Sequence, residues 1–274
     1  MIRDITIGQY YPAKSVLHRL DPRVKLVCTL FYLVSLFLFK SIPGYIVATL
    51  FLISVVRLSK VPFSYIMRGM KPVIMLLMIT VLFNLFLTRG GEVLLHVWVL
   101  TVTEEGLRTA VFMAVRLIYL IAGSSLMTFT TTPNELTDGI ESLLGPLNKL
   151  RVPVHEVAMM MSIALRFIPI LLEETDKIMK AQIARGADLE SGNIIQKAKS
   201  MVPILVPLFV SAFRRANDLA MAMEARCYRG GEGRTKMKPL HYRKCDYVAY
   251  VLMLLYVVAV VLIGRYVPFH IWIF

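Results

Sequence analysis

The chain has 274 residues, 57% of them hydrophobic, with a mean hydropathy of +0.65 and a formal net charge of +13. A soluble domain of this length has no need of so much apolar surface, so the composition excludes an ordinary soluble protein and indicates several membrane-spanning helices. A net charge this high would suggest nucleic-acid binding in a soluble protein, but here the placement of the charges gives another explanation.

Five apolar runs are candidates for transmembrane helices. The first two are short, and the segment 40–44 between them contains a Pro-Gly pair that predicts a tight turn. We therefore interpret these two runs as a helical hairpin, with a re-entrant loop as the alternative. The five runs are 24–39, 42–56, 72–88, 109–130 and 247–264.

The basic residues predict the orientation of these helices. If the N-terminus is cytoplasmic, 26 of the 31 Lys and Arg residues lie on the cytoplasmic side, as the positive-inside rule requires. The prediction is a multi-pass protein of a prokaryotic plasma membrane. It has a membrane domain of four helices (1–130), a cytoplasmic coupling domain (131–245) and a C-terminal transmembrane helix (246–274).

The residues after the fourth apolar run predict a short helix in the membrane interface. Thr132, Pro133 and Glu135 form a helix-start signal, with a capping threonine, a proline at the first helical position and a glutamate three residues after the cap. Apolar residues then lie on one side and acids on the other, up to Gly145-Pro146. An amphipathic helix directly after a membrane span is expected to lie along the membrane surface.

Two long helical patterns follow, the first from about Pro153 to Gly186 and the second from about Pro203 or Pro207 to Gly230. The second carries an apolar stripe and a row of small residues that allow another helix to approach closely. We expect the two helices to cross and pack on each other. The predicted packing residues are Leu205, Phe209, Ala212, Ala216, Leu219, Ala220 and Met223.

Both long helices close on an Ala-Arg pair, followed by glycine in the first and by cysteine in the second. Glycine adopts the left-handed conformation that ends a helix, which places the first arginine at the helix tip. A guanidinium there can make paired hydrogen bonds to an acidic or carbonyl-lined pocket of another protein. Because cysteine replaces glycine in the second, we expect that helix to continue toward Gly230. One helix-ending arginine is usually a solvated charge, but two at matching places favour docking. The predicted docking residues are Ala184, Arg185, Gly186, Ala225, Arg226 and Cys227.

Other chemistry-bearing residues give weaker signals. Residues 231–236 have the composition of a phosphate-binding loop in the wrong spacing, and His241 and Cys245 are two metal-ligand types without a third. We therefore expect no catalytic, cofactor or metal site. Arg116, in the middle of the fourth run, is costly there unless it pairs or reaches water. It either lines a path or fixes a partner, or it is structural, bonded to carbonyls or to polar neighbours such as Asn84, or snorkelling outward.

Ordered motifs between residues 20 and 226 carry a family resemblance. The chain closely resembles the transmembrane scaffold, or T component, of energy-coupling factor transporters. The motifs are Leu-Asp-Pro-Arg-Val-Lys at 20–25, Thr-Pro-Asn-Glu-Leu at 132–136, Leu-Arg-Phe-Ile-Pro at 165–169, Ala-Gln-Ile-Ala-Arg-Gly at 181–186 and Ala-Met-Glu-Ala-Arg at 222–226.

The resemblance implies a non-catalytic subunit of an ABC-type importer for a vitamin or metal ion. In that family the subunit joins two cytoplasmic ATPase subunits, which bind ATP and magnesium, to a small membrane protein that captures the substrate. The two Ala-Arg ends would dock on the two ATPases, with Cys227 departing from the family's glycine. A conventional ABC permease and, less favoured, a membrane-embedded enzyme are the alternatives. A scaffold shared among several vitamin-capture proteins is favoured over a dedicated system, and the cargo itself is not predicted.

Overall fold

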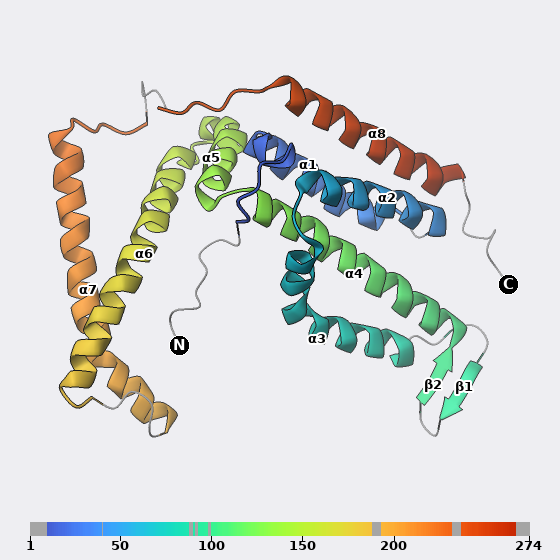
Figure 1. The fold of residues 1–274 in the computed structure, drawn as a ribbon, viewed down its shortest axis with the longest axis horizontal. Coiled ribbons are helices and arrows are strands. Elements are labelled where there is room, and N and C mark those ends of the chain that lie inside the picture. The colour runs from blue at the N-terminus through green and yellow to red at the C-terminus, as the bar shows by residue number, and fades with distance from the viewer. Residues whose placement is uncertain are drawn as a thin grey trace. The chain divides into compact units, whose positions relative to one another are not determined.

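The computed structural model describes residues 10–39, 41–87, 90, 93–97, 100–187, 193–231 and 237–266. The described chain is an array of helices with one β-hairpin, in agreement with the predicted all-α membrane fold (Figure 1). It divides into two compact units, one from the described parts of 8–139 and 240–274, the other from 140–239. The division falls after Gly139 and Pro239, whereas the predicted boundaries follow Thr130 and Cys245.

The first unit contains five complete helices. A short 3-10 turn at Leu17–Arg19 precedes the first of them. Although α8 closes the sequence, it packs against both α1 and α2, and α4 packs against α1 and α3. The helices are α1 (Pro22–Leu38), α2 (Ile42–Ser59), α3 (Phe63–Leu87), α4 (Glu104–Thr130) and α8 (Lys244–Tyr266).

The first two apolar runs form two separate helices, as the hairpin interpretation predicts. With 17 and 18 residues, α1 and α2 are each about 26 Å long at 1.5 Å per residue, slightly less than the roughly 30 Å of a bilayer's hydrocarbon core. The two helices are held together mainly through α8, which contacts both.

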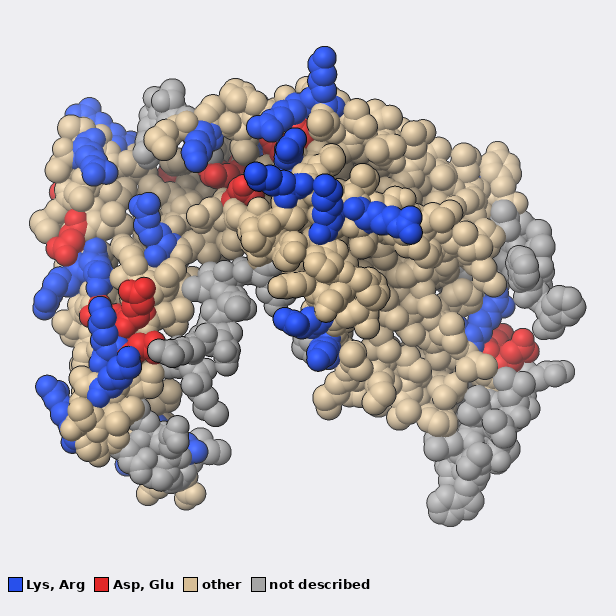
Figure 2. Space-filling model, in the orientation of Figure 1, with Lys and Arg blue, Asp and Glu red and all other residues tan. Residues whose placement is uncertain are grey.

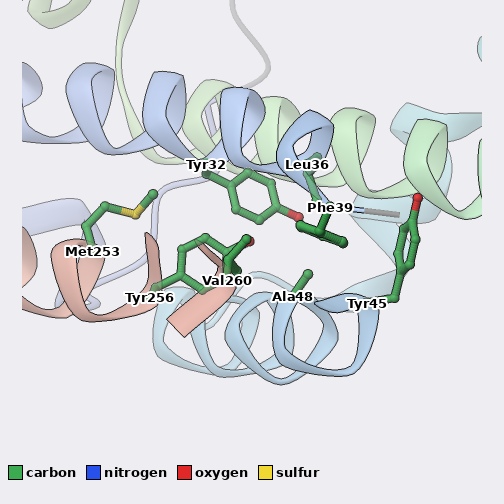
Figure 3. Close-up of a cluster of buried hydrophobic side chains, with 8 residues drawn as sticks. All are labelled: Tyr32, Leu36, Phe39, Tyr45, Ala48, Met253, Tyr256 and Val260. Carbon is green, nitrogen blue, oxygen red and sulfur yellow. The ribbon is translucent and has the colours of Figure 1, made fainter. Parts of the chain in front are cut away.

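An aromatic core joins α1, α2 and α8 (Figure 3). The ring of Phe51 on α2 stacks on Tyr256 of α8 with centroids 4.2 Å apart, and Tyr32 of α1 lies 5.9 Å from Phe51. The hydroxyl of Tyr256 pairs with that of Ser35 at 3.1 Å, so the polar atom of this buried ring is satisfied. The core therefore fixes the C-terminal helix to the N-terminal pair.

One carboxylate joins the starts of α1 and α8. Asp246, only 1% exposed, accepts hydrogen bonds from the backbone N–H of Asp21 at 2.9 Å and of Arg243 at 2.7 Å. Asp21 in turn caps α1 and pairs with Arg23, whose guanidinium lies over the Tyr242 ring. Burial opposes ionisation of Asp21, but the hydrogen bonds and charge of Arg23 outweigh it and hold the pKa of that carboxyl below its usual value.

The third apolar run differs from its prediction. The helix begins at Phe63 rather than at residue 72, and its two parts, Phe63–Lys71 and Val73–Phe86, meet at an angle of 65°. The bend falls at residue 72, a proline, which has no N–H to continue the helical hydrogen bonds. The proline therefore bends this helix and does not start it.

The chain between α3 and α4 forms an antiparallel β-hairpin of β1 (Val93–Val97) and β2 (Leu100–Thr103). Thr103 then caps α4, its hydroxyl accepting from the N–H of Gly106 at 3.2 Å. The cap therefore starts α4 directly after the hairpin.

The second unit contains the end of α5 (Pro133–Leu144), a 3-10 turn (Gly145–Leu150), α6 (Val154–Ala184) and α7 (Ile194–Ala225). The predicted capping box at the start of α5 is confirmed, because Thr132 and Glu135 exchange hydrogen bonds of 3.2 and 3.3 Å. The predicted start of the second long helix is wrong. It begins at Ile194, where Asn193 and Gln196 form another capping box, and Pro203 and Pro207 lie inside it.

Four described helices are long and apolar enough to cross a membrane, and α3 makes five if its bent halves form one span. The four are α2, α4, α6 and α8, so α6 qualifies although the prediction assigned it to a cytoplasmic domain. Its halves differ in sequence: residues 154–172 contain Glu156 and Arg166 as their charged residues, whereas five charges lie between 173 and 184. The apolar character of α6 is therefore confined to its first part.

Candidate functional site

The two long helices of the second unit run in opposite directions and pack on each other. Their ribbons meet toward the end of α6 and diverge toward its start (Figure 1). Glu174 of α6 pairs with Arg215 of α7 at 2.5 Å, and the amide of Gln182 donates to the backbone carbonyl of Pro203 at 3.2 Å. These two bonds fix the register of the pair.

The bond from Gln182 has a cause in the sequence of α7. A helical carbonyl normally accepts from the N–H four residues later, and the residue four after Pro203 is Pro207, which has no N–H. The Pro203 carbonyl is thereby left for the side chain of Gln182. The ribbon of α7 also bends within its length (Figure 1), as two internal prolines require.

The residues of the predicted packing stripe of α7 fall into two groups, one half-buried and one exposed. Ala212, Leu219 and Met223 are half-buried and share a helix face with Arg215, which contacts α6. Leu205 and Phe209 are 47% and 62% exposed, and Ala216 and Ala220 are exposed as well. Ile204 is the buried residue of this region, so the packed face is rotated by about one residue from the predicted stripe.

Both Ala-Arg ends have the same backbone geometry. At the end of α6 the N–H of Gly186 donates to the carbonyl of Ile183 at 2.9 Å, and that of Ala187 to Gln182 at 3.0 Å. At the end of α7 the N–H of Cys227 donates to Glu224 at 2.8 Å, and that of Tyr228 to Met223 at 3.1 Å. This pair of bonds is the Schellman motif, with an arginine as the last half-helical residue in each case.

The expectation that α7 continues to Gly230 is therefore wrong. The helix ends at Ala225, and Cys227 adopts the left-handed conformation with φ of 55°, in the place that Gly186 fills with φ of 86°. A side chain at this φ costs about 1 kcal/mol that glycine does not. Despite this strain, α7 ends with the same backbone geometry as α6.

The two ends are exposed and far apart. All six predicted docking residues are exposed. Since Gln182 contacts Pro203, the Arg185 end lies near the first third of α7, and a rise of 1.5 Å per residue puts the Arg226 end roughly 30 Å away. One small ligand cannot bridge that distance. Each arginine instead presents its guanidinium donors at a separate, exposed helix end.

A groove of purely apolar side chains runs along the exposed face of α7. The rings of Phe209 and Phe213, which line it, stack with centroids 6.4 Å apart. Contiguous exposed apolar surface of this kind marks contact with another protein or with lipid. The groove is lined by Val202, Leu205, Val206, Phe209, Val210 and Phe213.

The residues that gave weaker signals in the sequence lie outside α6 and α7. Arg116 donates to the carbonyl of Phe39 at 3.4 Å, at the C-terminal end of α1, and its guanidinium lies 5.4 Å from the ring centroid of Phe37. This geometry matches the structural alternative, in which a carbonyl holds the charge; Asn84 donates to its own helix instead. Most of 231–236 lies outside the described residues, and within those no group of three metal-ligand side chains gathers.

Comparison with known proteins shows which family the chain is similar to. A family model described as CbiQ, cobalt transport protein, matches residues 13–237. The energy-coupling factor transporter transmembrane protein EcfT of Clostridium kluyveri is 61% identical over 91% of this chain and 93% of its own length. The proteins of the same name in Thermosediminibacter oceani and Bacillus subtilis are 55% and 51% identical, over 91% and 88% of this chain and 94% and 91% of their own lengths.

Proposed function

The chain belongs to the family of energy-coupling factor transporter transmembrane proteins, and we propose that within such a transporter it links ATP hydrolysis to substrate uptake. Its partners are two cytoplasmic ATPase subunits, which carry the ATP and magnesium, and a small membrane protein that captures a vitamin or a metal ion. The chain itself is the non-catalytic scaffold between them.

The observation that carries this proposal is the equivalence of the two Ala-Arg ends. Two identical Schellman ends, both exposed and roughly 30 Å apart on an antiparallel helix pair, fit two similar partners better than one ligand. Arg185 binds a groove on one ATPase and Arg226 the equivalent groove on the other. The small Ala184 and Ala225 beside them let the walls of each groove close in.

The mechanism follows from the packing of α6 and α7. When ATP binding draws the ATPases together, each groove carries its arginine with it, and the angle between the two helices changes. The contacts available to guide this change are the Glu174–Arg215 ion pair and the Gln182 bond to Pro203. A helix pair with two discrete packings is the bistable element that such a transition needs.

The apolar groove on α7 is the surface proposed for the substrate-capture protein. A membrane subunit presents apolar side chains, and the groove offers Phe209 and Phe213 among aliphatic residues. A change in the angle between α6 and α7 would move this groove. The substrate-capture protein could then reorient and release its substrate on the cytoplasmic side. The proposed orientation, with the N-terminus and the Ala-Arg ends cytoplasmic, follows from the distribution of Lys and Arg.

The direct test replaces Arg185 and Arg226 by alanine, singly and together, in the full chain coexpressed with its partners. Losing one arginine from a buried hydrogen-bonded interface typically costs about 2–5 kcal/mol, so each single variant should weaken retention of the ATPases and the double variant should abolish uptake. Arg214→Ala is the control, because that arginine is exposed on α7 but is not at a helix end. Normal copurification and uptake in the double variant would refute the docking role.

A further inference from the structure

The first unit contains a deep apolar cavity that the proposed docking role does not use. Its volume is about 400 Å³, within the range of cavities that hold small organic ligands. The walls come from α1, α2, α4 and α8 and the segment before α1, and they are almost entirely apolar. Residues that form them include Val24, Tyr32, Leu52, Leu126, Val248 and Met253.

The cavity lies at one level of the membrane unit. The helices α1 and α8 contribute their first halves to its walls, whereas α2 and α4 contribute their last halves. Along α8 the lining extends from Lys244 to Met253, which is about 13 Å at 1.5 Å per residue and close to half of the roughly 30 Å hydrocarbon core. The cavity is therefore about as deep as one leaflet.

Its mouth faces outward through apolar residues. Val16, Leu58, Val248 and Leu252 line the cavity and are each at least half exposed, whereas Val24 and Met253 at its base are buried. In Figure 2 most of the surface of this unit is uncharged, and Lys and Arg gather toward the end where α1 and α8 begin. The mouth is thus an opening toward the hydrocarbon of the bilayer.

One end of the cavity is cationic. The ammonium of Lys25 is buried and donates to two uncharged acceptors, the carbonyls of Thr130 at 2.8 Å and of His18 at 3.4 Å. Lys244 lines the same end and is exposed at the rim. Three carboxylates near Lys25 are already engaged: Glu135 accepts from the N–H of Thr132, Asp21 pairs with Arg23, and Asp246 accepts from two backbone N–H groups.

We propose that this cavity binds one acyl chain of an anionic phospholipid, whose headgroup lies at Lys244 above the buried Lys25. The apolar walls and leaflet depth suit the chain, and the two ammonium groups attract the phosphate. In the orientation proposed above, the lipid belongs to the cytoplasmic leaflet. Bound there, it fills the space between four helices of the membrane unit. This binding depends on the membrane fold and not on the arginine ends.

Native mass spectrometry of the purified transporter complex tests the headgroup. After exchange into detergent with phosphatidylglycerol or phosphatidylcholine, the complex should retain the anionic lipid preferentially, and Lys244→Gln should lower that retention about fivefold, since a basic residue near the membrane surface contributes about 1 kcal/mol. Arg265→Gln, which removes an exposed cation at the other end of α8, is the control and should retain the lipid. Equal retention of both lipids, or no effect of Lys244→Gln, would overturn the proposal.

A cavity-filling variant tests the chain site without removing charge. Ala249→Leu narrows the cavity and should reduce labelling of α1 and α8 by phosphatidylglycerol with a photoreactive acyl chain, whereas Ala259→Leu, on α8 outside the lining, should leave labelling unchanged. Labelling of these helices that is the same in both variants contradicts the proposal. So does the absence of labelling in the intact complex, which would mean that a partner subunit fills the cavity.

Discussion

At the scale of single residues, position 227 distinguishes two otherwise equivalent helix ends. The cysteine adopts a left-handed φ of 55° and still makes both hydrogen bonds that the glycine end makes. The geometry at this position is thus imposed by the bonds that end the helix, against the preference of the side chain. Small size, which cysteine shares with glycine, is enough to keep Arg226 accessible.

Single substitutions at positions 227 and 186 should change the free energy of unfolding in opposite directions. Cys227→Gly relieves the left-handed strain and should raise the free energy of unfolding by up to about 1 kcal/mol, whereas Gly186→Ala should lower it by a similar amount. A side chain at Gly186 would meet no atom within 4 Å, so the expected loss comes from backbone strain alone. Thermal unfolding of the purified chain measures both.

Cys227→Ala is the matched control for this pair, because it removes the thiol and keeps the strain. Its unfolding temperature should stay close to that of the parent chain. If Cys227→Gly gave no more stability than Cys227→Ala, the left-handed conformation at this position would be contradicted.

The sequence predicted the two Ala-Arg ends but not their equivalence. The paired motif was visible in the spacing, and all six residues are exposed as a docking role requires. The end of α7 was misjudged because a cysteine is a weak signal for a left-handed position, and only the backbone bonds of Tyr228 and Cys227 reveal it. The acceptor of Arg116 could not be predicted for a similar reason, since the carbonyl of Phe39 is 77 residues away.

At the scale of elements, α7 shows how two prolines fit inside one helix. Pro207 leaves the Pro203 carbonyl without its usual donor, and Gln182 of α6 supplies one. The carbonyl that lacks a donor within α7 thereby accepts a hydrogen bond that joins α7 to α6.

A double-mutant cycle tests this compensation. In the parent chain Gln182→Ala should lower the free energy of unfolding by about 0.5–1 kcal/mol, because the Pro203 carbonyl loses its donor. In a Pro207→Ala background the new backbone N–H bonds that carbonyl, so the same change should cost nearly nothing. Equal costs in both backgrounds would show that the two positions are independent.

Local signals in the sequence identified a capping residue correctly and misplaced three prolines. The cap at Thr132 was predicted and confirmed, because a cap depends on residues only a few positions apart. The prolines at 72, 203 and 207 were read as starts, although each lies inside a helix whose neighbours tolerate it. The cavity among α1, α2, α4 and α8 depends on tertiary packing, so no local pattern could predict it.

At the scale of the whole molecule, the sequence predicted a membrane part interrupted by a second compact part, and the division into two units has the same order. The C-terminal helix returns to the N-terminal helices through the aromatic core and Asp246, contacts between residues more than 200 positions apart. Hydropathy identified the five apolar helices of the first unit, but which of them pack together could not be read from it.

The proposed orientation gives a prediction for labelling from each side of the membrane. In chains without their native cysteines, Lys197→Cys near the start of α7 should react with a membrane-impermeant maleimide only in inside-out vesicles. Glu104→Cys, exposed at the start of α4, should react only in right-side-out vesicles. Labelling of both positions from the same side would invert or break the proposed topology.

The ion pair between Glu174 and Arg215 lies midway between the two arginine ends. Arg185 lies eleven positions after Glu174, and Arg226 lies eleven positions after Arg215, so the two arms that extend from this point are each about 16 Å long. If Arg185 and Arg226 each bind an ATPase subunit, as proposed, equal displacements of the two ends would rotate the two helices by equal angles about this ion pair. A four-residue insertion in one arm would make the two rotations unequal while leaving both arginine ends intact.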